Sequence, residues 1–207
     1  MTARKAKDDP ILWDVDFDFT HLYVIPFVVG PRELPEVHQL THGRFHLIDF
    51  AWLPDRERIA ITHRPTPVDD DWTKTRLATV PTVQAEDGMP YDQNDLTDMA
   101  PIFAWGGMPR VSPDGNWIAC VTGEDPPPWG FTNRVGLYPT EGGTPTMLAW
   151  TPDGQCAGII GWSADGQWVY TCELSGMNSQ IWASPVTGEP GNAITMTNTQ
   201  KGPFSIN

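Results

Sequence analysis

Cysteine is rare in this chain, and no long hydrophobic run is present. The only cysteines among the 207 residues are Cys120, Cys156 and Cys172. Their spacing matches no zinc motif and their odd number leaves one thiol unpaired, so we interpret them as buried core thiols. Residues 1–9 carry basic side chains but no apolar run follows them. Neither a signal peptide nor a membrane span is therefore predicted, and the missing export signal favours the cytoplasm.

Basic residues are also scarce. The sequence has 13 Lys and Arg against 26 Asp and Glu, a formal net charge of −13. Proteins that bind nucleic acids or anionic membranes need clustered Lys and Arg to displace counterions. The composition therefore argues against nucleic acid and membrane as partners and favours neutral or basic ones.

Helical signals are nearly absent. No stretch sustains apolar residues at three-to-four spacing, and prolines interrupt most windows. The 19 Gly and 21 Pro are scattered at turns without a short period. With 40% hydrophobic residues and ten Trp, the composition indicates a packed, globular, all-β fold with many tight connections.

What the chain does contain is one turn signal repeated four times. It occurs as Leu53–Arg56, Ser112–Gly115, Thr151–Gly154 and Ser163–Gly166. In three of the four, a strand-like run follows at the same offset, and these three copies lie roughly 50 to 60 residues apart. Several strands per unit at such a period are typical of the blades of a β-propeller.

Each turn signal is expected to join the first and second strands of a blade. The blade pattern predicts strands over Leu47–Trp52, Arg58–His63 and Arg76–Val80; over Met108–Val111, Trp117–Thr122, Arg134–Tyr138 and Thr146–Trp150; and over Gly158–Trp162, Gln167–Glu173, Gln180–Ser184 and Ala193–Thr197. His21–Pro26 and Val37–Thr41 resemble the third and fourth strands of a blade whose first strand is missing, and Phe204–Asn207 resembles the opening of a further inner strand.

The sequence therefore predicts an all-β partial β-propeller, with about three complete four-stranded antiparallel blades plus partial blades at both ends. The expected divisions are 1–44 for the end of one blade, 45–100, 101–156 and 157–200 for three blades, and 201–207 for the start of another. Closed propellers have about four to eight blades. We expect either a fragment of a larger gene or an oligomer that completes its ring, with self-association through open blade edges.

Several short segments outside the repeated turn follow a pattern found in known propellers. They are Lys7–Ile11, His21–Val24, His38–Thr41, Phe50–Asp55, Arg58–Ala60 and Arg64–Pro67. These segments resemble the N-terminal propeller of the prolyl oligopeptidase-like serine peptidases, the S9 family. The acylaminoacyl peptidase and dipeptidyl aminopeptidase branch is the most similar, and the same Trp-Ser-Pro-Asp-Gly-like repeat occurs in the TolB propeller.

The resemblance implies that the propeller caps an α/β-hydrolase domain and admits short peptides to it. The serine nucleophile of such a domain lies in a Gly-x-Ser-x-Gly elbow. Here Gly161–Asp165 has Asp in place of the closing glycine, and Ser163 belongs to a repeat turn. The expected function is that of a non-catalytic fragment that gates or binds peptides, with a peptide or a hydrolase domain as partner. A TolB-like interaction scaffold is the alternative, and an enzyme built from propeller loops is a third class.

Loop residues supply the candidate binding site. Asp69, Asp70 and Asp71 form an acidic run between two expected strands, where they could hold a peptide amino group or Ca²⁺, or could be a solvated loop. Arg64, just before the run, suits either these acids or a substrate carboxylate. Trp105 precedes an inner strand near the expected central channel, and Trp129 follows a polyproline run in a long insertion.

Other conspicuous residues receive a structural interpretation. His38, His42 and His46 recur every fourth residue, a spacing that would form a zinc site on a helix, but Gly43 and strand-like flanks argue against a helix. No metal site and no cofactor is predicted. Repeating ring positions indicate packing between blades for four tryptophans: Trp52, Trp117, Trp162 and Trp168.

Overall fold

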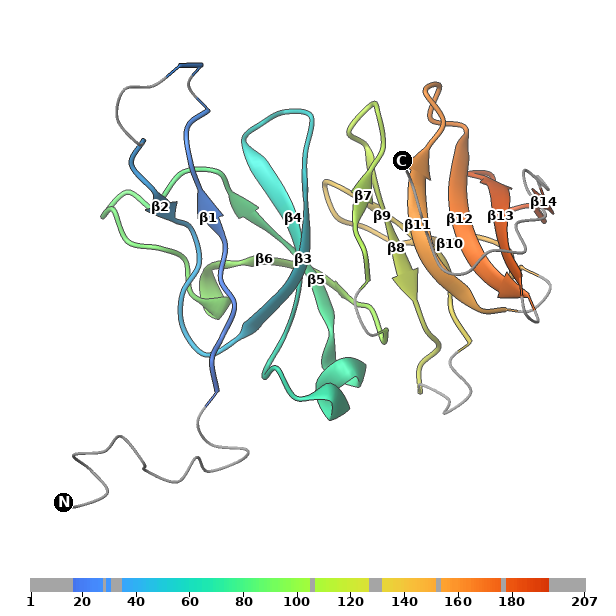
Figure 1. Cartoon of the computed structure of the whole chain (residues 1–207), viewed down its shortest axis with the longest axis horizontal. Helices are drawn as coiled ribbons and strands as arrows, with labels where there is room; N and C mark the ends of the chain where they lie inside the picture. The colour runs from blue at the N-terminus through green and yellow to red at the C-terminus, as the bar shows by residue number, and fades with distance from the viewer. Residues whose placement is uncertain are drawn as a thin grey trace.

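The structure is a computed structural model in which residues 17–27, 29–30, 35–104, 107–126, 132–151, 154–175 and 178–193 are described. Nearly all regular structure in these residues is β-strand. The sheets lie beside one another in chain order, from the N-terminal strands to the C-terminal ones (Figure 1). Within the described residues, the only helices are two short 3₁₀ segments, η1 (Asp69–Lys74) and η2 (Gln93–Asp95), and neither is long and apolar enough to cross a membrane.

In the described part of the chain, three antiparallel sheets of four strands form three blades, and a two-stranded sheet precedes them. The N-terminal strand pair is β1 (Tyr23–Val24) and β2 (His38–Gln39). The first blade is β3 (His46–Trp52), β4 (Arg58–Arg64), β5 (Arg76–Pro81) and β6 (Thr97–Pro101). The second blade is β7 (Arg110–Val111), β8 (Trp117–Thr122), β9 (Arg134–Pro139) and β10 (Thr146–Met147). The third blade is β11 (Cys156–Trp162), β12 (Trp168–Ser175), β13 (Asn178–Pro185) and β14 (Asn192–Ala193).

The predicted fold class is confirmed: this is a partial β-propeller with three four-stranded blades and a partial blade at its N-terminal side. Some strand lengths differ from the prediction. The expected Met108–Val111 and Thr146–Trp150 strands are reduced to the two-residue β7 and β10, and β6 was not anticipated. The expected inner strand at Phe204–Asn207 lies outside the described residues.

The repeated turn has one construction in the second and third blades. The Ser112 hydroxyl donates to Asp114 at 2.5 Å and accepts the backbone N–H of Trp117 at 3.0 Å. The same two bonds recur in the third blade around Ser163, where the donor–acceptor distances are 2.6 and 2.9 Å. The turn thus satisfies its own polar groups between two strands, which explains why this motif repeats once per blade.

In the first blade the same turn uses different residues. Leu53 stands at the serine position, and Asp55 alone accepts the backbone N–H groups of Glu57 and Arg58. The last turn position needs a positive φ, which is +76° at Gly115 in the second blade. Arg56 occupies that position in the first blade with φ +62°, a conformation that costs a side-chain-bearing residue free energy.

Two hydrophobic clusters hold the sheets together. The smaller one packs the N-terminal strand pair and its flanks against the first blade, and the larger one joins all three blades. The smaller cluster includes Leu22, Leu40, Phe45, Ile59 and Ile61; the larger includes Ala60, Leu77, Ile118, Leu137, Ile159 and Val169. All three cysteines are buried free thiols, as predicted, and burial raises the pKa of Cys156 to about 12.

One tryptophan prediction is wrong. Trp162 is half-buried, packs against the larger cluster and donates its indole N–H to the Arg110 carbonyl of β7 at 2.9 Å. Trp52 was expected to pack in the same way but remains 48% exposed. The physical reason is the size of the sheet that packs against each ring. β7 of the preceding blade contacts Trp162, whereas the N-terminal strand pair has only two strands among the described residues and Trp52 stays about half exposed.

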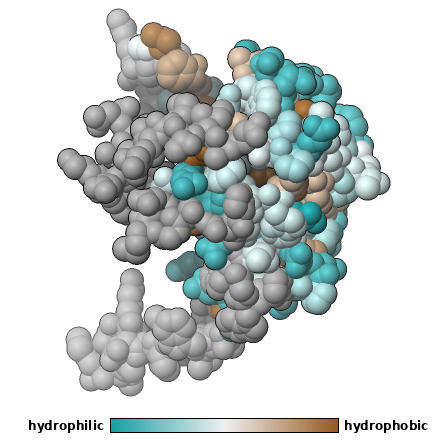
Figure 2. Space-filling model, turned by 90° about the vertical axis from the view of Figure 1, so that its right-hand side faces the viewer, coloured by the Kyte–Doolittle hydropathy of each residue, from teal (hydrophilic) through white to brown (hydrophobic). Residues whose placement is uncertain are grey.

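The surface at the third-blade end of the molecule is more hydrophilic than the surface in the N-terminal part of the chain. Figure 2 faces the end formed by the third blade, where the visible described residues are mostly hydrophilic or intermediate and the hydrophobic areas are small and separate. Large apolar side chains that are exposed gather instead in the N-terminal part of the chain, among them Tyr23, Ile25, Phe50 and Trp52.

Candidate functional site

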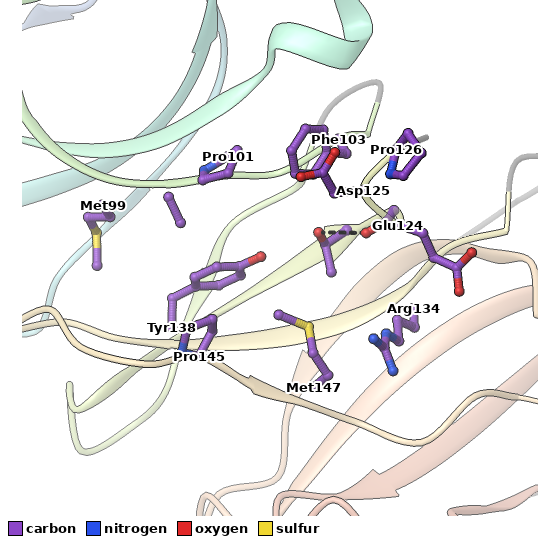
Figure 3. A pocket seen from close by; sticks show the side chains of 13 residues that line it. Met99, Pro101, Phe103, Glu124, Asp125, Pro126, Arg134, Tyr138, Pro145 and Met147 are labelled. Carbon is purple, nitrogen blue, oxygen red and sulfur yellow. Dashed lines mark hydrogen bonds between the residues drawn. The ribbon is translucent and has the colours of Figure 1, made fainter. Parts of the chain in front are cut away.

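A pocket of about 790 Å³ lies between the outer strand of the first blade and the second blade. Its lining comes from β6, from β8 and the loop after it, and from β9 and β10 (Figure 3). Its lining includes the side chains of Met99, Phe103, Glu124, Asp125, Arg134, Tyr138 and Met147. The pocket is open to solvent at one side and has mainly apolar walls, the combination expected of a binding site.

A close backbone approach forms one wall of the pocket. The Gly123 N–H donates to the Ile102 carbonyl at 3.0 Å. A Cβ at position 123 would lie 2.3 Å from the Phe103 carbonyl oxygen, so only glycine lets these two segments meet. The contact fixes Phe103, whose φ is +51°, at the pocket rim.

A second glycine positions the aromatic ring on the opposite wall. A Cβ at Gly136 would lie 2.9 Å from the nearest ring carbon of Tyr138, so the ring lies flat along its own strand. The Tyr138 hydroxyl points into the pocket (Figure 3). Burial raises the pKa of this phenol to about 12, and its hydrogen bond with Thr122 opposes only part of that effect. Tyr138 therefore stays a neutral hydrogen-bonding group at physiological pH.

Charged side chains of both signs stand at one end of the pocket. Glu124 and Asp125 are exposed carboxylates in the loop that follows β8. The Arg134 guanidinium lies 4.8 Å from the centroid of the Trp150 ring, a cation–π contact, and its buried Nε has no hydrogen-bond partner among the described residues. The site thus combines apolar walls with charged side chains of both signs.

The predicted candidates Arg64 and Asp69 lie elsewhere, at the end of β4 and in η1. Arg64 is 8% exposed and donates from Nη2 to the Pro67 carbonyl at 3.0 Å. Its distance to Asp69 Oδ1 is 3.8 Å. Arg64 therefore bonds to the loop backbone and makes a long ion pair with the acidic run. Pairing with these acids was one of the two alternatives that the sequence left open.

The acidic run is not a uniformly solvated loop. Asp69 and Asp70 are exposed, but Asp71 is buried and accepts hydrogen bonds from Thr66 Oγ1 at 2.5 Å and Lys74 Nζ at 2.7 Å. Burial alone would raise the pKa of Asp71, but these bonds outweigh it and hold the pKa below its usual range. Asp71 is thus a structural residue that closes η1, while Asp69 and Asp70 remain available to solvent.

Two predicted candidates, Trp105 and Trp129, lie outside the described residues and stay predictions. His38 and His46 belong to different strands, with His42 between them. In the part of the chain that the structure describes, no three His, Cys, Asp or Glu side chains come together in a way that could hold a metal ion.

Sequence reasoning missed the pocket residues Met99, Arg134, Tyr138 and Met147. One signal was available: a glycine inside a predicted strand often marks a close approach of another group, and Gly136 interrupts the expected Arg134–Tyr138 strand. The presence of Met99 and Met147, from two different blades, in one pocket had no local signal.

Comparison with known proteins supports the fold. No protein-family model matches the sequence, and no curated protein matches it. Among solved structures, a putative TolB from Agrobacterium tumefaciens has 20% identity and a TM-score of 0.57, covering 80% of this chain and 53% of its own. A puromycin hydrolase has 16% identity and a TM-score of 0.53, covering 77% and 25%. Prolyl oligopeptidase B from Galerina marginata, bound to a 35mer substrate, has 11% identity and a TM-score of 0.51, covering 80% and 25%.

At these identities the similarity establishes the fold. The resemblance to TolB-like and prolyl oligopeptidase-like propellers that the sequence suggested is thus confirmed at the level of structure. The chain spans about half the length of the TolB chain and about a quarter of the two peptidase chains.

Proposed function

We propose that this chain is a non-catalytic part of a propeller that binds short peptide segments in the pocket between the first and second blades. The observation that carries the proposal is the pocket itself, with apolar walls from two blades and opposite charges at one end. In a longer protein of the prolyl oligopeptidase type, such a site would bind or gate peptides for an α/β-hydrolase domain. A cytoplasmic location belongs to the same proposal, and fractionation of cells that contain the natural protein tests it.

The ligand class follows from the lining. Met99, Phe103 and Met147 offer an apolar surface with adaptable thioether side chains. Glu124 and Asp125 favour a cationic group beside it, such as a peptide amino terminus or a Lys side chain. The net charge of −13 adds a long-range attraction for cationic peptides. The expected ligand is a short peptide with a free amino terminus next to apolar residues.

The proposal assigns no chemistry to Ser163, the serine of the elbow-like sequence. Its hydroxyl donates to Asp165 and accepts the Trp168 N–H within the β11–β12 turn. Ser112 makes the same contacts in the second blade. A nucleophile elbow lies between a strand and a helix, whereas Ser163 joins two strands of a blade.

A TolB-like interaction scaffold is the second candidate. The comparison favours it in one respect, because the TolB chain from Agrobacterium tumefaciens is covered over the larger share of its length, 53%. The two functions differ in the size of the ligand. A peptide-binding propeller binds tetrapeptides in the pocket, whereas a scaffold binds a folded partner over a wider surface and leaves tetrapeptides unbound.

The experiment uses methionine methyl groups as reporters. The chain has seven methionines, of which Met99 and Met147 line the pocket from different blades and Met89 is exposed elsewhere. Methyl-labelled protein is titrated with the peptide Ala-Leu-Phe-Ala, with either a free or an acetylated amino terminus. Met99 and Met147 should shift together while Met89 stays in place.

Removing either charge of the proposed contact, the peptide's amino-terminal charge or the Glu124 carboxylate, should weaken binding to the same extent. Acetylation of the peptide should lower its affinity about tenfold, because it removes one charge-assisted contact. Glu124→Gln should do the same for the free peptide only. Asp70→Asn, which removes an exposed carboxylate away from the pocket, is the control and should change nothing. A titration to millimolar peptide without a shift at Met99 or Met147 would refute the proposal.

A further inference from the structure

Arg134 is the basic side chain in the pocket lining, and no acidic side chain of the described residues pairs with it. Its guanidinium lies 4.8 Å from the centroid of the Trp150 ring. Glu124 and Asp125 line the same pocket, yet neither forms an ion pair with Arg134. The Arg134 Nε atom is buried and has no hydrogen-bond partner among the described residues. A guanidinium stays charged and carries five N–H donors, so the pocket holds a cation whose donors the described part of the chain does not use.

Backbone hydrogen bonds next to Arg134 hold it against Trp150. The Asn133 N–H donates to the Gly154 carbonyl at 2.9 Å, and the Asn133 carbonyl accepts the Cys156 N–H at 3.2 Å. A Cβ at Gly154 would lie 3.7 Å from the Trp150 ring, so the ring lies against this residue. The segment that supports the ring is therefore also bonded to the residue before Arg134. This shared support fixes the guanidinium relative to the ring.

A buried carboxylate of the third blade anchors the same segment. Glu173, on β12, is 0% exposed. Its Oε1 atom accepts the Thr151 hydroxyl and, at 3.1 Å, the backbone N–H of Gln155. Burying a carboxylate is unfavourable unless it is hydrogen-bonded, so these two bonds couple the position of the segment to the core of the third blade. Because Thr151 directly follows Trp150, the third blade contributes to the geometry of a pocket that its described residues do not line.

A carboxylate is the ligand group that suits this arginine. The planar guanidinium matches a carboxylate through two parallel hydrogen bonds, and stacking on an aromatic ring leaves free the edge that carries the donors. Glu124 stands at the same side of the pocket as Arg134 (Figure 3). Two charges of opposite sign that do not pair with each other suit a ligand whose amino and carboxylate groups lie close together.

The distance between those two groups depends on the length of the peptide. An extended chain spans at most about 3.5 Å per residue, so a dipeptide reaches about 7 Å and a tetrapeptide about 14 Å. In extended form, only the shorter peptide keeps both of its charges at one end of the pocket. Its two side chains then lie along the apolar walls that Met99, Phe103 and Met147 provide. A single amino acid has only one side chain for these walls.

We propose that Arg134 is a specificity-determining residue that binds the terminal carboxylate of a free dipeptide with apolar side chains. The amino group of the dipeptide lies at Glu124 and Asp125, and its carboxylate accepts two hydrogen bonds from the guanidinium. Glu173 is a positioning residue that acts through Trp150 and touches no ligand atom. The inference rests on the proposed function, because it refines the ligand of the same pocket.

Amidation of the ligand tests the carboxylate contact. The methyl-labelled 207-residue chain is titrated with Leu-Phe and with its C-terminal amide, and Met99 and Met147 report binding. The amide should bind about tenfold more weakly because it loses a charge-assisted contact. Ala-Leu-Phe-Ala and its amide should bind equally, since the carboxylate of the longer peptide lies beyond Arg134. We call the ratio of the two dipeptide affinities the carboxylate preference.

Variants separate the contact from its support. Arg134→Gln should lower the carboxylate preference to about one, because the guanidinium is lost. Arg56→Gln, which removes an exposed arginine outside the pocket lining, is the control and should leave the preference unchanged. Glu173→Ala should lower the preference about threefold by loosening the cation–π contact, whereas Glu173→Gln keeps a carbonyl acceptor and should retain it. Trp150→Leu removes the ring and should act like Glu173→Ala, so it tests the same step if that variant does not fold.

Equal binding of Leu-Phe and its amide would overturn the inference, as would a carboxylate preference that survives in Arg134→Gln. Amidation that weakens the tetrapeptide as much as the dipeptide would contradict the assigned length. An unchanged preference in both Glu173→Ala and Trp150→Leu would contradict the positioning role. In each of these cases, shifts of Met99 and Met147 with the tetrapeptide leave the proposed function intact. No shift with any of the four peptides refutes both.

Discussion

We expect His63 to make the contact between the N-terminal strand pair and the first blade sensitive to pH. It lies on β4, 3% exposed, with its ring 5.4 Å from the Phe45 ring in an edge-to-face arrangement. Its Nδ1 has no hydrogen-bond partner among the described residues. Burial lowers the pKa of His63 from 6.5 to about 4, with Asp98 opposing this effect and Arg76 adding to it. The fold therefore holds this imidazole neutral.

The sign and size of the effect follow from that pKa. Well above pH 6.5 the ring is neutral in both the folded and the unfolded state and its titration does not affect stability. As the pH falls from 6.5 toward 4, the unfolded chain binds a proton that the folded chain does not, so stability is lost. The full loss is about 3 kcal/mol below pH 4, at about 1.4 kcal/mol for each pKa unit, and about 2 kcal/mol of it falls between pH 7 and pH 5.

Urea denaturation at pH 7 and pH 5 measures this loss. His63→Gln removes the titrating group, so the decrease in unfolding free energy between the two pH values should be about 2 kcal/mol smaller than in the unchanged protein. His38→Gln, a substitution on the half-buried β2, is the control and should keep the original decrease. An identical pH dependence in the unchanged protein and His63→Gln would refute the reasoning, as would NMR titration of His63 near pH 6.5.

Other substitutions test the packing in urea denaturation. Trp162→Ala should lower the unfolding free energy by about 3 kcal/mol because it removes a ring packed between blades. Trp52→Ala should lower it by only about 1 kcal/mol because that ring is 48% exposed. Equal losses would contradict the difference in packing between the two rings. Arg56→Gly should raise the unfolding free energy by about 0.5 to 1 kcal/mol, since φ is +62° there, and a loss of stability would count against the turn assignment. Asp71→Asn should cost about 1 kcal/mol through its contact with Lys74 and Asp70→Asn nothing; the reverse order would contradict the role of Asp71 in closing η1.

The sequence correctly predicted the strands in which a run of β-branched or aromatic residues follows the repeated turn. The expected Trp117–Thr122 strand coincides with β8, and the expected Arg58–His63 strand differs from β4 by one residue. Both runs are rich in β-branched or aromatic residues and start shortly after the repeated turn. Local sequence therefore determines where these strands begin. In contrast, β6 is Thr-Asp-Met-Ala-Pro, a composition poor in strand-forming residues, and it forms a strand only because the β5 edge is available.

The candidate site was harder to predict because it depends on contacts between blades. Trp52 and Trp162 occupy the same position in their repeats, yet one is exposed and the other covered, because the strand that covers each belongs to another blade. The pocket likewise joins Met99 of the first blade to Met147 of the second. No local pattern encodes either arrangement. The acidic run, in contrast, was conspicuous in the sequence, although Asp71 proved to be structural.

The most direct test of the central claim, that stacked blades leave one face of the first blade open, is the rate of oxidative labelling at each tryptophan in the folded 207-residue chain. Mass spectrometry of the labelled peptides gives the rates for Trp52 and Trp162 in one experiment, with the urea-unfolded chain as reference. The account predicts that Trp52, which is 48% exposed, is modified several-fold faster than Trp162. Equal protection of the two rings would contradict it.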